Sequence, residues 1–414
     1  MISIEFQRPK GMRDVLAPES WRIEKFRTRA MGLATQYGFD LIETPILEQS
    51  SVFLRVGETT DIVQHERYRF EDVGGDDLTL RPEGTAAVAR AYIENGLNAA
   101  PQPVRLTYWA PMFRREKPQA VRYRQHTQFG AELYGSDRPE AEAEVIFLAL
   151  SAVEAVGLLN PVVRVNSIGC TTCRPAYRQA LVAYYQSRRS DLCQDCQTRI
   201  NSNPLRLLDC KIDVAIRAAA PDIADYWCED CRLHQQQVMT LVQDAGRNIM
   251  RDPYLVRGLD YYTRTVFEVG HPQLGEGTAL FGGGRYDGLT TALGGTAVPA
   301  VGFGMGVERL LSSVQDTFLP EPVMRVYVAS LPGAQAHSTL LAEELRRAGL
   351  NANSDVLARS LKAQLKDAGR RADLVLIVGG QEWDNGQVVV RELATGSQQT
   401  ISRDDILGYL SRTR

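Results

Sequence analysis

Residues 104–134 read VRLTYWAPMFRREKPQAVRYRQHTQFGAELY, and no other stretch says as much about the fold. The runs 104–114 and 127–134 are rich in β-branched and aromatic residues, which is typical of strands. Between them lies a polar, basic segment, 115–126, that contains a proline. We therefore expect two antiparallel strands joined by a long hairpin loop exposed to solvent.

The hairpin loop and its borders concentrate positive charge. The cations are Arg114, Arg115, Lys117, Arg122 and Arg124. Clustered cations are suited to phosphate groups, although a basic run is more often a solvated loop. Glu116 stands among them, which favours an internally paired site with a defined shape over a diffuse patch.

The rest of the chain mixes predicted helices and strands. Before residue 320, expected helices are 21–37, 86–94 and 307–314, and expected strands are 41–47, 78–81, 254–269 and 301–306. After a linker at Pro320-Glu321-Pro322, expected strands at 325–329, 374–378 and 387–391 alternate with expected helices at 338–348 and 357–368. The pattern predicts a boundary near residue 320, followed by a small α/β domain, 324–414.

All seven cysteines lie between Cys170 and Cys231, in a segment, 166–250, whose pattern turns helical. They form three CxxC pairs, Cys170/Cys173, Cys193/Cys196 and Cys228/Cys231, with Cys210 in addition. In a cytosolic chain this clustering favours metal or redox chemistry over disulfides, and two pairs can close a structural zinc site. Buried reduced thiols are the alternative, and the spacing leaves open which pairs would bind.

Composition and charge exclude several classes of protein. With 414 residues, 44% of them apolar and 23% charged, the chain has the composition of an ordinary soluble protein of two or three domains. A net charge of −3 argues against a generally basic surface for nucleic acid. The N-terminus does not have the pattern of a signal peptide, and no apolar run is long enough to span a bilayer. We therefore expect a cytoplasmic protein.

Residues 257–268, RGLDYYTRTVFE, combine an arginine with two adjacent tyrosines. The guanidinium of Arg257 matches a phosphate or carboxylate, and Tyr261 and Tyr262 each offer an apolar wall with a hydrogen-bonding tip. The segment predicts a pocket for an anionic group beside a flat ring. A half-buried strand with an ordinary surface arginine is the alternative.

Three acceptors, Glu83, Gln128 and Glu132, lie on or beside apolar strands. A buried carboxylate is costly without a partner, so a cationic ligand group is one explanation for them. Core salt bridges with Arg114 or Arg257 are the other.

Arg309 stands at the start of an expected helix, after a strand that contains Gly302, Gly304 and Gly306. Small residues there would let a flat ligand lie against the backbone beneath Arg309. A packed glycine-rich strand is the competing interpretation. The nearby GGGRYDG segment, 282–288, lacks the spacing of the common nucleotide fingerprints.

Taken together, these motifs resemble those of the histidyl-tRNA synthetase family of class II synthetases, from about Pro9 to the C-terminus. The segments that carry the resemblance are 10–14 (KGMRD), 41–71 with 57–63 (GETTDIV), 81–85 (RPEGT), 113–116 (FRRE), 257–262 and 304–309 (GMGVER). Each motif is weak alone, and the whole set is specific.

The resemblance implies an α+β fold. A class II antiparallel sheet catalytic domain, 1–320, would contain a helical cysteine-rich insertion, 166–250, and an α/β anticodon-binding domain, 324–414, would follow. It also implies ATP-dependent ligation of L-histidine to histidine tRNA through histidyl-adenylate, carried out by a homodimer with ATP and Mg²⁺ as the substrate complex.

The resemblance further implies roles for individual residues. Glu83, Thr85 and Gln128 would hold the α-ammonium group of histidine, Glu132 and Tyr262 would contact its imidazole, and Tyr261 would line the pocket. Arg114 and Arg257 would be the catalytic residues at the α-phosphate. Arg114, Glu116, His126 and Arg309 would bind ATP, with Arg309 over the adenine and at the γ-phosphate.

Two departures from the family pattern and two rival functions accompany this prediction. Residues 117–122 read KPQAVR where many relatives have RPQKGR, and His126 stands where an aromatic residue is common. One rival is a synthetase-like regulatory subunit of histidine biosynthesis, a class of protein that usually lacks the C-terminal domain and loses ATP-site residues. The other is a zinc-dependent RNA-binding module, which would not explain Glu83, Gln128 and Glu132.

Overall fold

The computed structural model describes residues 6–57, 66–116, 123–259, 261–274, 279–314, 317–319 and 324–413. The chain forms two compact units, Met1–Pro320 and Glu321–Arg414. The linker at residues 320–322, residues 58–63 of the motif and residues 117–122 of the basic loop lie outside the described residues. In the described part of the chain, every helix is too short or too polar to cross a membrane.

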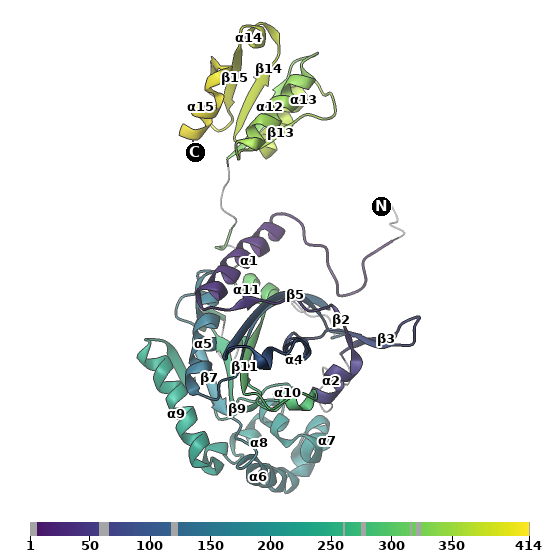
Figure 1. Ribbon diagram of the computed structural model, residues 1–414, viewed down its shortest axis with the longest axis vertical. Coiled ribbons are helices and arrows are strands. Elements are labelled where there is room, and N and C mark those ends of the chain that lie inside the picture. The colour runs from purple at the N-terminus through teal and green to yellow at the C-terminus, as the bar shows by residue number, and fades with distance from the viewer. Residues whose placement is uncertain are drawn as a thin grey trace. The chain divides into compact units, whose positions relative to one another are not determined.

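An eight-stranded sheet forms the centre of the first unit (Figure 1). In spatial order its strands are β1 (Asp40–Leu41), β5 (Val104–Phe113), β6 (Gln125–Tyr134), β11 (Ala300–Gly306), β10 (Ala279–Arg285), β9 (Thr263–Gly270), β7 (Val162–Ser167) and β8 (Asn248–Arg251). The pairs from β5 to β7 are antiparallel, and β1 and β8 add parallel edges. The predicted antiparallel hairpin is confirmed, since β5 pairs with β6 from Val104↔Tyr134 to Phe113↔Gln125.

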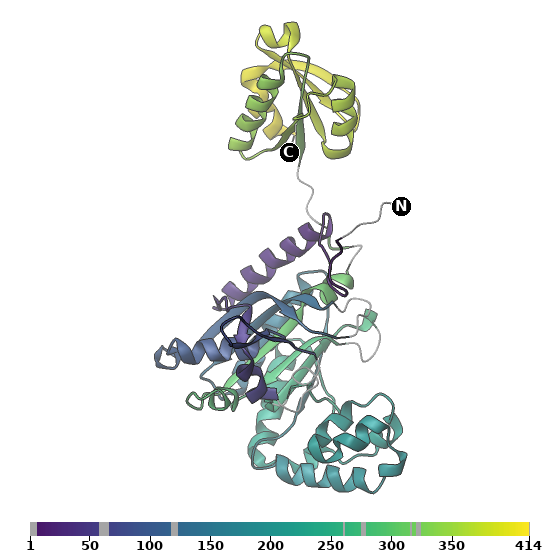
Figure 2. The same ribbon diagram turned by 90° about the vertical axis from the view of Figure 1, so that its right-hand side faces the viewer.

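Helices cover one face of this sheet, and the other face carries a cavity. Helices α1 (Glu19–Gln36), α5 (Pro139–Glu154), α9 (Glu229–Asp244) and α11 (Val307–Ser312) pack on the first face (Figures 1 and 2). On the second face lie α2 (Ser50–Gly57), α4 (Thr85–Glu94), α10 (Leu289–Ala292) and a small sheet of β2 (Leu47–Gln49), β4 (Asp77–Leu80) and β3 (Tyr68–Glu71).

The alternation of side chains along β6 separates the two faces. Phe129, Ala131 and Leu133 belong to the core beneath α5. Because successive side chains of a strand point to opposite faces, Gln128 and Glu132 face the other side. An apolar core on one side therefore fixes where the polar acceptors of the same strand point.

A helical insertion leaves the sheet after β7 and returns at β8. It contains α6 (Arg174–Gln186), α7 (Gln194–Ser202), the short helix η3 (Pro204–Asp209), α8 (Val214–Ala218) and α9. Figure 2 shows α6 to α8 as a lobe beside the sheet. Helix α9 belongs to both parts, because it packs on α5 as it returns. We name the segment between β7 and β8 the insertion module.

Two predicted strands are wrong over part of their length. Residues 41–47 form the ends of two strands in different sheets, β1 and β2, because the chain crosses between the sheets through Pro45, which has no N–H to donate. The strand predicted for 254–269 begins only at Thr263. Of the described residues before it, 257–259, Tyr261 and Tyr262 line the cavity described below, and Leu255 and Val256 pack in the core.

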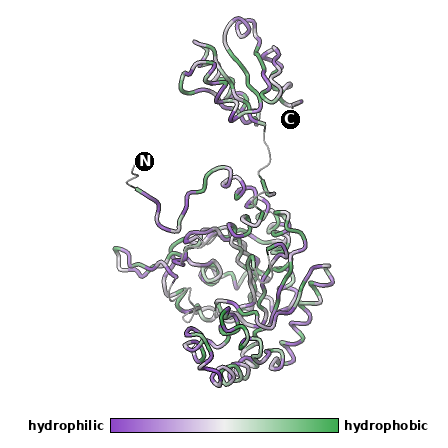
Figure 3. Tube along the Cα trace, turned by 180° about the vertical axis from the view of Figure 1, so that it is seen from behind, coloured by the Kyte–Doolittle hydropathy of each residue, from purple (hydrophilic) through white to green (hydrophobic). Residues whose placement is uncertain are grey.

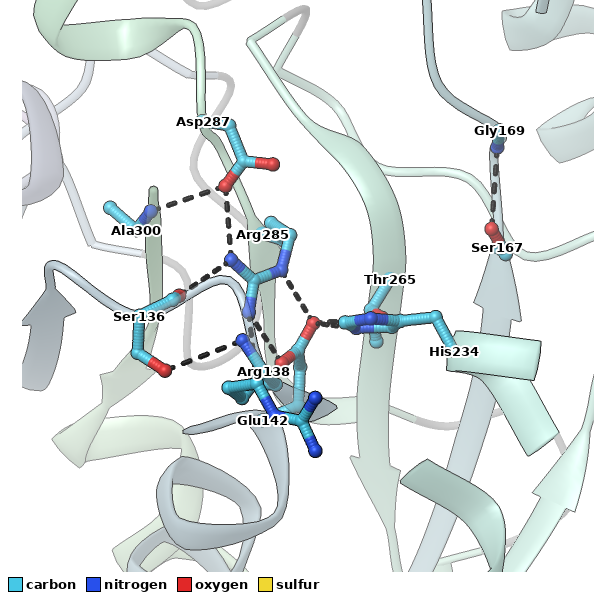
Figure 4. A network of polar contacts seen from close by, with 10 residues as sticks. All are labelled: Ser136, Arg138, Glu142, Ser167, Gly169, His234, Thr265, Arg285, Asp287 and Ala300. Atoms are coloured by element: carbon cyan, nitrogen blue, oxygen red, sulfur yellow. Dashed lines mark hydrogen bonds and ion pairs between the residues drawn. The ribbon is translucent and has the colours of Figure 1, made fainter. Parts of the chain in front are cut away.

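A buried charge network joins α5, α9, β9 and β10 (Figure 4). Arg285 and Glu142 are both fully buried, and the guanidinium donates to the carboxylate twice at 2.6 Å. His234 Nε2 and Thr265 Oγ1 lie 2.6 and 3.1 Å from Glu142 Oε1, and Asp287 accepts from Arg285 at 3.0 Å. Burial alone would raise the pKa of Glu142, but Arg285 and then His234 hold it at about 2.

Glu142→Gln should destabilise the first unit by about 3–5 kcal/mol at pH 7, because it removes the fully buried carboxylate that pairs with Arg285 and leaves only Asp287 as an acidic partner. The folded-state pKa lies below the unfolded value, so this stability is present above about pH 4.5 and is lost as the pH falls towards 2. Urea unfolding between pH 7 and 3 measures both effects, and the acid-induced loss should be shallower in the variant.

Glu140→Gln on the same helix is the matched control, because Glu140 is exposed and meets Arg138 at 3.4 Å at the surface. We expect it to change the free energy of unfolding by less than about 0.5 kcal/mol. Equal effects of the two substitutions would contradict a structural role for the buried network.

The second unit is an α/β domain. Its sheet has the order β13 (Asn351–Ser354), β12 (Arg325–Ser330), β14 (Leu374–Val378), β15 (Gln387–Glu392) and β16 (Gln398–Ser402). Helices α12 (Gln335–Arg347) and α15 (Ile406–Arg412) pack on one face, and α13 (Leu361–Arg371) packs on the other. The predicted alternation of strands and helices is confirmed. In Figure 3 hydrophilic and hydrophobic stretches alternate along the helices, as expected for helices with one buried face.

Candidate active site

A cavity of about 370 Å³ opens on the second face of the large sheet. All the predicted site residues except Glu132 line it: Glu83, Thr85, Arg114, Glu116, His126, Gln128, Arg257, Tyr261, Tyr262 and Arg309. They come from α4, β6, α11 and the segments next to β5 and β9. The fold thus gathers four separate sequence motifs around one space.

Glycines make room for the site's own side chains. A Cβ atom at Gly302 would overlap the Glu132 carboxylate, and one at Gly304 would overlap the Gln128 amide. In the same way, Gly282 leaves space for the Arg257 guanidinium. Gly302 and Gly304 of β11 therefore leave room for the side chains of Glu132 and Gln128 on β6. This supports the interpretation of β11 as a tightly packed glycine-rich strand. Beside Gly306 a Cβ would make only an ordinary contact, so the surface there stays open to a ligand.

One end of the cavity carries hydrogen-bond acceptors. Glu83 sits just before α4, where its carboxylate accepts the backbone N–H groups of Thr85 at 2.7 Å and Ala86 at 2.9 Å. Gln128 Oε1 accepts from the N–H of Gly84 at 3.2 Å. Burial raises the pKa of Glu83 despite these donors. A buried carboxylate of this kind favours a cationic partner.

Glu132 lies one layer deeper than predicted. It is fully buried, and its carboxylate accepts from Thr85 Oγ1 at 2.7 Å, from the Tyr286 hydroxyl and, at 3.4 Å, from the Tyr108 hydroxyl. Burial raises the pKa of Glu132 to about 8, although Tyr286 and Thr85 oppose the shift. The Glu132 carboxyl therefore takes up a proton more readily than an ordinary glutamate does. Glu132 lies behind Thr85, which lines the cavity and donates a hydrogen bond to the carboxyl group.

Tyrosine rings form the wall between the two ends. The ring centroids of Tyr261 and Tyr262 lie 4.8 Å apart, and Tyr286 lies 5.7 Å from Tyr261. Burial raises the pKa of Tyr262 to about 12, so its hydroxyl keeps its proton. Arg174 of the insertion module donates to the backbone carbonyl of Tyr262 at 2.8 Å. The position of Tyr262 is thus fixed by a contact from the insertion module as well as by its neighbours in the chain.

The other end of the cavity carries guanidinium groups. Arg114 donates from Nε to the carbonyl of Pro82 at 2.8 Å. Arg257 Nη1 meets Glu268 at 2.5 Å, and Arg309 projects from the start of α11. The acidic partner of Arg257 is therefore Glu268 on β9, and Glu83 and Glu132 are held by hydrogen bonds from other groups. The alternative interpretation paired Glu83 or Glu132 with Arg114 or Arg257. The salt bridge that Arg257 forms is instead with Glu268.

His126 adds a neutral ring beside the arginines. Burial, and then the charge of Arg114, lower its pKa to about 3. An uncharged imidazole can stack on an aromatic ligand without repelling the guanidinium groups. Of the loop cations that the structure describes, Arg114 lines the cavity, whereas Arg124 donates to the carbonyls of Glu116 and Lys10.

Several lining residues had escaped the sequence prediction. The polar ones with ionisable side chains are Glu66, Tyr123, Arg206 and Glu308. Glu308 accepts the N–H of Thr127 at 2.9 Å, and its place in the GMGVER motif was a signal for it. Arg206 comes from η3 of the insertion module, and no local pattern connects it with the rest of the site.

Comparisons with known proteins match the chain to two families. A family model described as histidyl-tRNA synthetase matches residues 11–310, and one described as an anticodon binding domain matches residues 326–413. The chain is 44% identical to a histidine–tRNA ligase of Desulforamulus reducens, over 98% of this chain and 99% of the relative. It is 43% identical to that of Thermosipho melanesiensis, over 97% and 98% of the two chains.

A solved structure gives the same result. The apo histidyl-tRNA synthetase of S. aureus superposes with a TM-score of 0.81 at 34% identity, covering 99% of both chains. A Bacillus halodurans structure described as an ATP phosphoribosyltransferase regulatory subunit/histidyl-tRNA synthetase shares the fold at 22% identity and a TM-score of 0.69. With two domains, a cavity built from the predicted motifs and relatives matched over nearly their full length, the chain belongs to the histidyl-tRNA synthetase family.

Proposed function

We propose that this protein ligates L-histidine to its tRNA in two steps, first forming histidyl-adenylate from histidine and ATP and then transferring histidine to the tRNA. The observation that carries the proposal is the division of one cavity into an acceptor end and a guanidinium end, with tyrosines between them. This arrangement suits a ligand that is cationic at one end, flat in the middle and bound to phosphates at the other.

The acceptor end suits the amino acid. Glu83, Thr85 and Gln128 hold the α-ammonium group, and Tyr261 and Tyr262 enclose the ring. Glu132 acts on the imidazole from behind Thr85, in concert with Tyr262. The Tyr262 hydroxyl would lose its imidazole partner when another side chain is bound, so analogues are rejected strongly.

The guanidinium end suits ATP with its Mg²⁺. Attack of the histidine carboxylate on the α-phosphorus builds negative charge on the phosphoryl oxygens, and Arg114 and Arg257 stabilise it from fixed positions. The attacking carboxylate is already ionised, so the step needs no general base. His126 and Arg309 hold the adenine and the γ-phosphate, and Glu116 shapes the same wall.

Two observations weigh against the regulatory-subunit alternative. Arg114, Arg257 and Arg309 all line the cavity, and a binding protein for histidine alone has no use for them. The second unit also matches the anticodon-binding family model. The zinc-dependent RNA-binding module is disfavoured because such a module has no need of the acceptors at one end of the cavity.

The second unit offers a basic face for the anticodon. Lys362, Lys366 and Arg370 are exposed at four-residue spacing on α13. Arg359, which the sequence placed within this helix, precedes it and is paired internally with Asp355 at 2.5 Å. We propose that the three exposed cations contact the tRNA and that Arg359 maintains the fold.

We further propose that the enzyme acts as a homodimer in the cytoplasm, as its family resemblance implies. The cysteine-rich insertion module holds structural zinc, because its thiols gather in groups that could each surround a metal ion.

One assay tests the activity. Purified protein should catalyse exchange of pyrophosphate into ATP that depends on histidine, and should then charge histidine tRNA. Exchange without charging would show that adenylate formation works and that the defect lies in the contacts with tRNA, including the altered loop at residues 117–122. Absence of histidine-dependent exchange would overturn the proposed function and favour the regulatory subunit.

A further inference from the structure

The seven cysteines fall into two groups, and the grouping could not be read from their spacing. The first group joins the outer CxxC pairs: Cys170, Cys173, Cys228 and Cys231. The second joins the middle pair to two later residues: Cys193, Cys196, Cys210 and Asp213. Within each group all the candidate ligand atoms lie within 4.8 Å of one another, and all seven cysteines are free of disulfides.

The sulfur separations match a single tetrahedral ion in the first group. Cys170 Sγ lies 3.7 Å from the sulfurs of Cys173 and Cys228, and Cys173 Sγ lies 3.7 Å from that of Cys231. A tetrahedral zinc with Zn–S bonds of about 2.3 Å has S···S edges of about 3.8 Å. A disulfide would require a sulfur separation of about 2.05 Å.

The second group fits a site with three sulfurs and one oxygen. Cys193 Sγ lies 3.9 Å from Cys210 Sγ, which lies 3.5 Å from Asp213 Oδ2. For Zn–S and Zn–O bonds of about 2.3 and 2.1 Å, the expected S···O edge is about 3.6 Å. Asp213 also accepts the N–H of Cys193 at 3.1 Å, which orients its carboxylate towards the sulfurs.

Backbone N–H groups point at the sulfurs in both groups. Cys170 N–H donates to Cys173 Sγ at 3.2 Å, and Thr172 N–H donates to Cys170 Sγ at 3.4 Å. The N–H groups of Ile212 and Asp213 donate to Cys210 Sγ at 3.4 and 3.3 Å. Such donors stabilise thiolates and fix their direction, as the second shell of a metal site does.

We propose that the insertion module contains two separate structural zinc sites, one at each of these groups. The single-ion spacing of the sulfurs excludes a cluster of several irons, whose thiolates stand farther apart. This inference specifies the zinc of the proposed function by number, ligands and task, and the count of metal ions does not depend on the ligase activity.

The first site closes the base of the insertion module. Cys170 and Cys173 follow β7, and Cys228 and Cys231 begin α9, 58 residues later in the chain. Gly169 leaves room for Cys173 Sγ, and its carbonyl accepts from the N–H of Arg264 at 3.0 Å. The site therefore sits against the start of β9.

The first site also reaches the tyrosine wall. Arg174, whose N–H donates to the carbonyl of Cys170 at 2.9 Å, donates from its side chain to the carbonyls of Gly169 and Tyr262. Arg174 is thus a positioning residue between the metal site and Tyr262. Loss of the first zinc should loosen the pocket for histidine.

The second site holds the segment that carries Arg206. Helix η3 runs from Pro204 to Asp209, between the two halves of this site, α7 with Cys196 and the turn with Cys210. Arg206 reaches the cavity beside Gly258, with its guanidinium 3.7 Å from where a Cβ of that residue would lie. The second zinc should therefore fix an arginine at the mouth of the cavity.

Elemental analysis of the full-length protein, purified without added metal, tests the proposal. We expect two zinc ions per chain in the wild type and one in each of the double variants C170S/C173S and C193S/C196S. One zinc or none in the wild type, or iron in place of zinc, would overturn it. Histidine calorimetry on C170S/C173S should show at least a ten-fold loss of affinity, whereas C193S/C196S should retain its affinity.

A second measurement avoids dependence on variants that fail to fold. Cobalt(II) exchanged into the wild-type protein should give thiolate-to-cobalt absorption in two steps, equivalent to four thiolates and then three, or the reverse. Asp213→Asn should weaken binding of the second ion at least ten-fold, and Asp191→Asn, an exposed carboxylate of the same module outside both groups, should not. Unchanged binding in Asp213→Asn would remove Asp213 from the ligands and overturn the second site as proposed.

Discussion

Arg257→Ala should lower histidine-dependent pyrophosphate exchange by about 10²–10³-fold while leaving the affinity for histidine nearly unchanged. Removing one preorganised donor to the developing charge has an effect of this size, about 3–4 kcal/mol in the barrier. Arg257 lines the guanidinium end of the cavity and is fixed there by Glu268 at 2.5 Å. Its charge therefore stands in place before the reaction begins.

Steady-state exchange and histidine calorimetry on the same preparation separate the two effects. Glu268→Gln is the informative companion, because it keeps Arg257 but removes the carboxylate that positions it. We expect an intermediate loss of about ten-fold in turnover. A large loss of histidine affinity in Arg257→Ala would show that the residue serves the amino acid pocket and would contradict the role assigned here.

Glu83→Gln should weaken histidine binding by about 30-fold or more. The carboxylate is buried at the acceptor end, and truncating one partner of a buried charge pair costs about 2–5 kcal/mol, much of it from the ammonium left without a counter-charge. The substitution keeps the carbonyl oxygen, which can still accept one of the N–H groups at the start of α4.

Glu83 could instead act only as the N-terminal cap of α4, where it accepts two backbone N–H groups. Binding of a ligand without an ammonium group distinguishes this role from recognition of the ammonium. Imidazole-lactate carries a hydroxyl where histidine carries its ammonium group. If Glu83 recognises the ammonium, its substitution should cost little affinity for imidazole-lactate and much for histidine. Equal losses for both ligands, with a lower melting temperature, would mean that Glu83 acts only as a helix cap.

Local patterns were sufficient for the sheet hairpin and for the chemistry of the motifs. The β5–β6 pair was predictable because alternation and β-branched composition are short-range signals, and the two strands are neighbours in the chain. The types of Arg257, Tyr261 and Tyr262 suggested a pocket but left open a half-buried strand with a surface arginine, and only the structure places the three side chains at the cavity. Their neighbours 254–256 were wrongly predicted as strand, because an apolar run does not show whether it pairs in a sheet or packs in the core, as Leu255 and Val256 do.

The role of the glycines of β11 could not be predicted from the sequence. From the chain alone they were compatible with a bound ligand or with tight packing. Pairing with β6 places Gly302 opposite Glu132 and Gly304 opposite Gly130, where a Cβ atom would overlap the Glu132 carboxylate and the Gln128 amide respectively, so acceptors on the neighbouring strand need the space. Register between strands distant in sequence is a property of the folded sheet, and no local window contains it.

The sequence by itself determined the family motifs, the two-domain plan and the types of side chain at the site, because residue type and short-range spacing carry that information. Only the tertiary structure decided that Glu132 lies behind Thr85, that Glu268 is the partner of Arg257, and that Arg206 reaches the cavity from the insertion module. It also decided which cysteines stand together. These are distances through space between residues far apart in the chain, and they are set by how the sheet and the insertion module pack.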